Sequence, residues 1–212
     1  MLKLHATRKL FDRLPVNNQG QLPVTPRSQW LFDRASSETG PLDNWHGNLV
    51  NLQRRNCLLL VHGATRFPLV LPSLTKPDFR ELNDRFVDTF MNTLLKCGAE
   101  DLQLEAAHQQ IGVLSVDTYH DRSSQATLSR MKEEIEHLLW HDNANISDLS
   151  GYRLGAWLAD TPRSIRGRYL WPKQEMLKLL GELARTPAQT KASGHSGTLP
   201  DNVVSMDDFR HR

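Results

Sequence analysis

The stretch 45–71 constrains the fold most strongly, because it alternates short apolar runs with turn-like segments. Apolar runs at 49–52 and 57–62 flank the polar segment 53–56, a pattern typical of a β-hairpin with a four-residue loop. A second turn leads into a third apolar run at 67–71. Strands joined by short turns must pair antiparallel, so the stretch predicts three neighbouring antiparallel strands.

Helical periodicity dominates the sequence that follows. Apolar residues recur at three- and four-residue spacing across 79–95, which predicts a long helix that ends in a left-handed cap at Gly98. A further strand is expected at 111–119. Three more helices are expected after Ser123 or Ser124, after Ser147, and from Pro172.

The order of these elements predicts an α+β fold. Leu2 and Leu4 alternate with polar residues and indicate one more strand at the start of the chain. Because strands precede most helices, we expect an antiparallel sheet of about four to five strands with helices packed on one face. Residues 1–185 are expected to form this single domain, in which 15–43 is a long irregular loop.

The C-terminal segment 186–212 has a different composition, dominated by Thr, Ala, Ser, Gly and Pro. Such a segment cannot bury enough apolar surface to fold, so a disordered, flexible tail is predicted. Apolar residues return within 202–209, beyond this spacer, and could dock onto a partner protein.

Composition and charge narrow the classes of protein. A formal net charge of +2 is too small to indicate nucleic-acid binding by itself. The two cysteines make no disulfide framework, which favours a reducing compartment. Neither a secretory leader nor a run of roughly 18 apolar residues that could span a bilayer is expected. These features predict a soluble, cytoplasmic protein outside the membrane, and they leave its oligomeric state open.

Residues 45–48, Trp-His-Gly-Asn, offer the first candidate site. A glycine beside His46 leaves room for a substrate, and Asn48 could orient the imidazole or donate to an oxyanion. In the alternative interpretation, Trp45 packs in the core and the two polar side chains satisfy loop backbone.

Basic residues at the two turns offer a second candidate. Arg54 and Arg55 could clamp a phosphate through bidentate hydrogen bonds, or could simply be solvated. His62 and Arg66 flank the next turn. The strand register decides whether His62 meets His46, because a slip of one residue moves a side chain to the opposite face.

The run 117–124 joins a strand to a helix N-terminus, where free N–H groups could bind an anion. Arg122 would add a positive charge to such a site. The alternative is an ordinary capping loop. The other polar residues of this run include Tyr119, His120 and Ser123.

Two further patterns carry less information. His137 and His141 share a helix face, but no metal-binding motif surrounds them, so neither a metal nor another cofactor is predicted. The basic stretch 163–173 contains interleaved aromatic residues and could contact a nucleic acid. It could equally be held by the acidic helix face at 133–136.

Several segments together resemble an uncharacterised bacterial family defined as a domain of unknown function. The segments are WHGNL at 45–49, RRNCLLLVH at 54–62, TRF at 65–67 and DRSSQATLSRM at 121–131. They match the family's W-H-x-N-L and N/D-R-S-x-x-x-x-L-x-x-M patterns over a resemblance that covers residues 1–185. The resemblance implies that the two patterns belong to one shared feature, and it supplies no catalytic residues.

Two functions are expected from these patterns. The first is an interaction or regulatory module of unknown ligand. It would bind a protein partner through residues 202–209. The second is a metal-independent hydrolase acting on a phosphate-containing substrate such as RNA, in which His46 would move protons with His62 or His120. The residues expected to bind, if they converge on one pocket, are Trp45, Asn48, Arg54, Arg55, Arg122 and Ser123.

Overall fold

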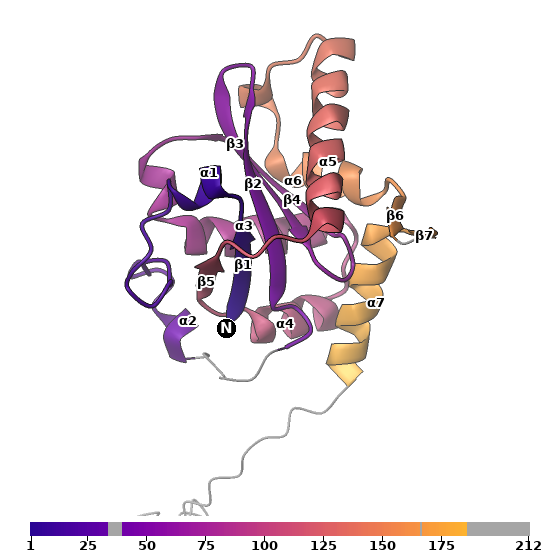
Figure 1. The fold of residues 1–212 in the computed structure, drawn as a ribbon. Helices are drawn as coiled ribbons and strands as arrows, with labels where there is room; N and C mark the ends of the chain where they lie inside the picture. The colour runs from indigo at the N-terminus through magenta and orange to yellow at the C-terminus, as the bar shows by residue number, and fades with distance from the viewer. Residues whose placement is uncertain (34–39, 166, 186–212) are drawn as a thin grey trace, which may run out of the picture.

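The computed structural model describes residues 1–33, 40–165 and 167–185, and it contains a five-stranded sheet with the order β4-β3-β2-β1-β5 (Figure 1). The predicted α+β class is confirmed, and the sheet has a strand number within the predicted range. The strands are β1 (Leu2–Ala6), β2 (Asn44–Leu52), β3 (Arg55–His62), β4 (Pro68–Leu74) and β5 (Leu114–Asp117).

The sheet is mixed, which departs from the antiparallel sheet that was expected. β2, β3 and β4 pair antiparallel, and Pro68 begins the edge strand β4. In contrast, β1 lies between β2 and β5 and is parallel to both. A parallel pair needs a long connection, and the chain between β1 and β2 provides one. The strands that are joined by short turns are therefore antiparallel, as predicted. β1 has no short turn to its neighbours in the sheet, so that argument does not apply to it.

Helices surround this sheet. α3 and α7 lie where helices were predicted, and Gly98 follows α3 with a φ of 80°. α4 was not predicted, because its buried residues are only two alanines and give little amphipathic signal. The α-helices are α1 (Arg8–Phe11), α2 (Trp30–Asp33), α3 (Leu82–Lys96), α4 (Asp101–Gln110), α5 (Arg122–His141), α6 (Gly151–Ala159) and α7 (Pro172–Arg185).

Two short 3₁₀ turns precede helices. One, Pro77–Phe79, lies before α3 at the start of the predicted helix. The other, Ile146–Asp148, contains Ser147, so α6 begins later than Ser147 would indicate, at Gly151.

The helices cover both faces of the sheet instead of the single face that was expected. β3 is apolar at every position from Cys57 to Val61, so both of its faces need cover. Leu58 and Leu60 pack in a core with Phe86 and Phe90 of α3. Leu59 and Val61 pack on the opposite face with Leu128, Met131 and Ile135 of α5. Figure 1 shows α5 standing in front of the sheet, with α3 behind it.

The β2–β3 hairpin turns more tightly than the predicted four-residue loop. Gln53 and Arg54 have φ of 46° and 65°, the left-handed conformation that a two-residue type I′ turn requires. Arg55 already belongs to β3. The side chain of Gln53 donates to the carbonyl of Ala144 and accepts from the N–H of Ile146, which fixes the hairpin tip to the segment after α5.

The segment 15–43 is packed against the core over much of its described length. Leu22 and Leu31 are buried. Gln21 forms a bridge to Ser115 on β5, at the edge of the sheet. The predicted irregular loop thus contains α2 and contributes to the core.

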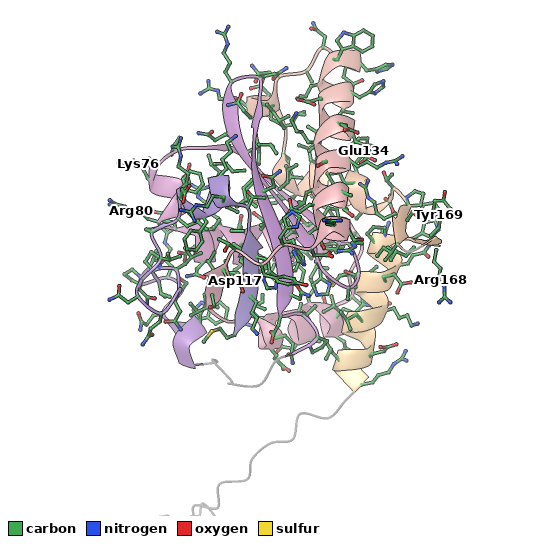
Figure 2. All side chains as sticks on the ribbon, viewed as in Figure 1. Lys76, Arg80, Asp117, Glu134, Arg168 and Tyr169 are labelled. Atoms are coloured by element: carbon green, nitrogen blue, oxygen red, sulfur yellow. The ribbon has the colours of Figure 1, made fainter. Side chains whose placement is uncertain are left out.

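The basic stretch 163–173 forms a β-hairpin followed by the start of α7, which begins at Pro172 as predicted. β6 (Arg163–Ile165) pairs antiparallel with β7 (Arg168–Leu170). Arg163 is buried, and its two terminal nitrogens donate to the two carboxylate oxygens of Glu134 at 2.8 Å each. Figure 2 labels Glu134 on α5. The structure therefore agrees with the alternative interpretation, in which an acidic helix face holds this stretch.

The predicted flexible tail, 186–212, and its docking peptide, 202–209, lie outside the described residues. Cys57 and Cys97 are both buried and free. Within the described part of the chain, no helix combines the length and the apolar character that crossing a membrane requires.

Candidate functional site

His5 and Asp117 form a hydrogen-bonded pair at the carboxyl-terminal ends of two parallel strands. They are direct partners in the pairing of β1 with β5. Nδ1 of His5 lies 2.6 Å from Oδ1 of Asp117. Because a carboxylate only accepts hydrogen bonds, the neutral ring of His5 carries its proton on Nδ1 and keeps a lone pair on Nε2. The pair therefore presents a nitrogen that can take up a proton.

His46 lies beside His5 on the next strand. The pairing of β1 with β2 places the two residues at the same register, and their ring centres are 4.8 Å apart. His46 is 2% exposed, and its Nδ1 has no hydrogen-bond partner among the described residues. Burial, followed by repulsion from His5 and Arg66, lowers the pKa of His46 from 6.5 to about 4. This imidazole is therefore neutral near neutral pH.

Tyr119 joins the two buried rings to the surface. It lies in the segment between β5 and α5, which crosses the front of the sheet in Figure 1. Its ring centre is 5.0 Å from that of His5 and 6.5 Å from that of His46. Its backbone N–H donates to Oδ1 of Asp117, and its side chain is 62% exposed. We call His5, His46, Asp117 and Tyr119 the histidine cluster.

The first turn of α5 borders the cluster and is held by Arg66. This arginine, in the β3–β4 turn, is buried and has a φ of 58°. Its guanidinium donates to the hydroxyls of Ser123 and Ser124 and lies 3.7 Å from a carboxylate oxygen of Asp121. Asp121 also accepts from the hydroxyl and N–H of Ser124, and these bonds hold the pKa of Asp121 below its ordinary value.

The capping alternative therefore describes the N-terminus of α5. The carboxylate of Asp121 occupies the place that an anion was expected to take. The charges of Asp121 and Arg66 both act on His46. The Trp-His segment and the Asp-Arg-Ser-Ser junction are therefore near enough for charges at the junction to act on His46.

Trp45 and His62 lie on the face of the sheet opposite His46. Successive residues of a strand point to opposite faces, and Trp45 pairs with His62 in register. Trp45 is fully buried and its indole N–H donates to the carbonyl of Leu42. His62 is also fully buried, and its ring nitrogens contact Thr65 and the carbonyl of Pro41. Burial lowers the pKa of His62 to about 4. His46 and His62 are therefore not brought together.

The remaining predicted residues are only partly gathered. Asn48 lies two positions beyond His46 on β2 and accepts a hydrogen bond from the hydroxyl of Thr7. Arg54 and Arg55 are exposed at the hairpin tip, the end of β2 and β3 away from His46. His120 and Arg122 are exposed near the start of α5, and Ser123 there contacts Arg66.

Sequence reasoning did not identify the His5–Asp117 pair. The two residues are 112 positions apart, and only the parallel pairing of β1 with β5 brings them together. Arg66 was noted only as flanking a turn. The available signals were polar residues at the ends of apolar runs, His5 after Leu4 and Asp117 after Val116, which is where parallel strands place functional groups.

The described residues contain no group of three or more His, Cys, Asp and Glu side chains arranged to hold a metal ion. His137 and His141 stack with ring centres 6.2 Å apart on α5.

Comparison with known proteins gives one match. A family model described as a domain of unknown function (DUF6933) matches residues 3–175. No curated protein and no solved structure matches the chain. The matched range includes the whole histidine cluster and the first turn of α5.

Proposed function

We propose that the chain, which belongs to the family of unknown function DUF6933, is a metal-independent hydrolase with His5 as its general base. The observation that carries this proposal is the 2.6 Å contact between Nδ1 of His5 and Asp117, beside a second imidazole. A carboxylate bound to one ring nitrogen fixes the tautomer in which the other nitrogen is basic. The base lies at the carboxyl-terminal ends of neighbouring parallel strands, a frequent location for binding sites.

In this reaction Nε2 of His5 takes a proton from the nucleophile, which is a water molecule or a hydroxyl group. Asp117 then stabilises the imidazolium that forms, and the proton passes to the leaving group. A positioned base of this kind contributes roughly 10²–10⁴-fold to the rate. Such a pair moves protons without needing a metal ion.

His46 supports this role by being neutral. A protonated ring 4.8 Å away would oppose the charge that His5 acquires, and the low pKa of His46 removes that repulsion near neutral pH. The exposed Tyr119 lies next to His5 and carries a hydroxyl that can donate to a developing negative charge.

A protein-interaction or regulatory module is the second candidate, favoured by Trp140, which is 80% exposed near the end of α5. A large exposed indole is typical of binding surfaces. This proposal predicts that deleting 186–212 weakens partner binding in a pull-down with full-length protein as reference. Unchanged binding would show that residues 186–212 do not contribute to partner binding.

The hydrolase proposal is tested with three chromogenic or fluorogenic probes: a p-nitrophenyl ester, bis-(p-nitrophenyl) phosphate and a quenched RNA oligonucleotide. All assays contain EDTA. We expect turnover of at least one probe by the wild type and by His120→Ala, because His120 is exposed and outside the cluster. His5→Ala is expected to lose about 100-fold or more. Turnover of no probe, or an equal rate for His5→Ala, would contradict the proposal.

A further inference from the structure

A hollow lies beside the β6–β7 hairpin, and nothing in the proposed reaction uses it. It has a volume of about 710 Å³ and is bounded by the hairpin, the first turn of α7 and the β3–β4 turn. Apolar and charged side chains are mixed in its wall, as in pockets that orient a polar ligand. The lining residues are Ala64, Ile165, Arg168, Tyr169, Leu170 and Glu175.

Tyr169 gives this pocket an exposed aromatic ring. The residue is 79% exposed although it lies in a strand, and Trp171, two positions later, is 46% exposed. Figure 2 shows Tyr169 and Arg168 at the outer edge of the molecule. Every nucleobase has a π-face that stacks on such a ring, so an exposed tyrosine beside a cation is suited to single-stranded nucleic acid.

Arg168 supplies the cation. Of the basic residues nearby, Arg163 is bound to Glu134, and Lys173 lies 3.2 Å from a carboxylate oxygen of Asp160. Arg168 makes no ion pair with any residue in the described ranges. Its guanidinium can therefore meet a phosphate in two parallel hydrogen bonds.

The remaining wall suits a nucleoside. Ile165 and Leu170 offer apolar surface to the face of a base. The carboxylate of Glu175 only accepts hydrogen bonds, so it can pair with an exocyclic amine of a base or with a ribose hydroxyl. RNA is commonly recognised in this way, with stacked bases and hydrogen bonds to base edges and to the 2′-hydroxyl.

The pocket and the histidine cluster lie on two sides of the first turn of α5. Ala64 in the pocket wall belongs to the same β3–β4 turn as Arg66, which binds Ser123 and Ser124. Figure 2 shows Asp117 on one side of this end of α5 and Tyr169 on the other. Arg122, the first residue of α5, is exposed.

We propose that this pocket binds one nucleotide of single-stranded RNA and thereby sets the substrate class of the hydrolase. The substrate assignment rests on the proposed function, whereas RNA binding by the pocket does not. In the corresponding reaction, His5 removes the proton of a 2′-hydroxyl and O2′ forms a bond to the adjacent phosphorus. The bond from phosphorus to the 5′-oxygen breaks, and that oxygen receives the proton.

The test is the affinity of the full chain for a fluorescein-labelled oligouridine of about 12 nucleotides, measured by anisotropy at about 50 mM salt. Tyr169→Ala is expected to raise Kd roughly 5- to 150-fold, the loss of one base–aromatic stack. Tyr169→Phe should retain wild-type affinity. Trp140→Ala is the matched control, because Trp140 is equally exposed but lies at the other end of α5.

Salt dependence tests the arginine separately. Arg168→Ala is expected to reduce the slope of log Kd against log salt by about 0.7, the loss of one contact to a single-strand phosphate. The pocket assignment is overturned if the wild type fails to bind at low salt, if Tyr169→Ala binds normally, or if Trp140→Ala loses as much affinity.

The two proposals fail in different ways. In the His5→Ala background, which should not cleave the oligouridine, Tyr169→Ala should still raise Kd, because His5 lies outside the pocket. Tight binding that depends on Tyr169, without turnover of any of the three probes, would overturn the hydrolase and leave the pocket. Cleavage that depends on His5 but not on Tyr169 or Arg168 would overturn the pocket alone.

Discussion

The rings of His5 and His46 lie 4.8 Å apart because β1 and β2 pair in parallel with these two residues at the same register. The adjacent pairing of β1 with β5 places Asp117 against His5 from the other side. Three strands thus bring together two imidazoles and a carboxylate that are widely separated in the sequence. The chemistry of the site follows from this register, because a slip of one residue would send His5 to the opposite face.

Replacing Asp117 by Asn tests its role in positioning His5. An amide can donate to Nδ1, which favours the tautomer with the proton on Nε2 and removes the basic nitrogen. We expect the turnover rate to fall by about 100-fold, with a changed pH–rate profile. Because the Asp117 side chain is half exposed, the urea unfolding midpoint should stay close to that of the wild type. A normal rate at every pH would contradict the positioning role.

Stability should decrease as the pH falls from about 6.5 to about 4, because His46 and His62 have depressed pKa values in the folded chain. In this range the unfolded chain binds more protons than the folded chain, so acid favours unfolding. The stabilisation is fully present above the unfolded pKa and is lost as the pH approaches the folded value. Together the two residues are expected to change the free energy of unfolding by a few kcal/mol.

Urea unfolding at several pH values measures this effect. His62→Gln should flatten the pH dependence relative to the wild type, because it removes one of the two buried groups. Exposed His137 provides the control, and His137→Gln should leave the dependence unchanged. A free energy of unfolding that stays constant down to about pH 4.5 would contradict the burial of neutral imidazoles.

Arg163 and Arg130 both contact Glu134, but from different environments. Arg163 has a side chain that is 3% exposed, and Arg130 has one that is 72% exposed. Arg163→Ala removes two charge-assisted hydrogen bonds from a buried guanidinium, so it is expected to cost about 1.5–3 kcal/mol. Arg130→Ala should cost about 0.5 kcal/mol or less. Chemical denaturation of both variants measures the difference, and equal losses would show that the burial of Arg163 is unimportant.

Gly151 and Gly181 should respond oppositely to alanine. A Cβ on Gly151 would lie 2.3 Å from the carbonyl oxygen of Val70, which cannot move without distorting β4. Gly151→Ala is therefore expected to destabilise the fold by about 1–3 kcal/mol. Near Gly181, in α7, the nearest atom would be 3.7 Å away, so the higher helix propensity of alanine should stabilise by up to about 1 kcal/mol. A thermal melt of each variant tests the sign.

Local patterns were sufficient to predict much of the fold. The hairpins β2–β3–β4 and the helices α3, α5 and α7 follow from short turns and from apolar periodicity. The parallel placement of β1 does not, because it depends on partners far along the chain. The apolar run in β3 predicts a strand, but that helices cover both faces of the sheet is seen only in the assembled structure.

The candidate site was predicted in part, for the same reason. His46 and the junction at Ser123 were identified from polar residues at the ends of strands and at a helix start, and Arg66, which binds Ser123, also acts on His46 through its charge. His62 was considered a partner of His46 because both lie at strand ends, and the strand register places it on the opposite face. Asp117 could not be assigned to His5 without the β1–β5 pairing.

The most direct measurement of the central claim is the turnover rate of His5→Ala with and without added imidazole. We predict a rate about 100-fold or more below that of the wild type, which rises as imidazole enters the space left by the side chain and saturates at high concentration. His120→Ala should keep the wild-type rate and show no response to imidazole. A His5→Ala rate equal to that of the wild type would show that His5 is not the general base.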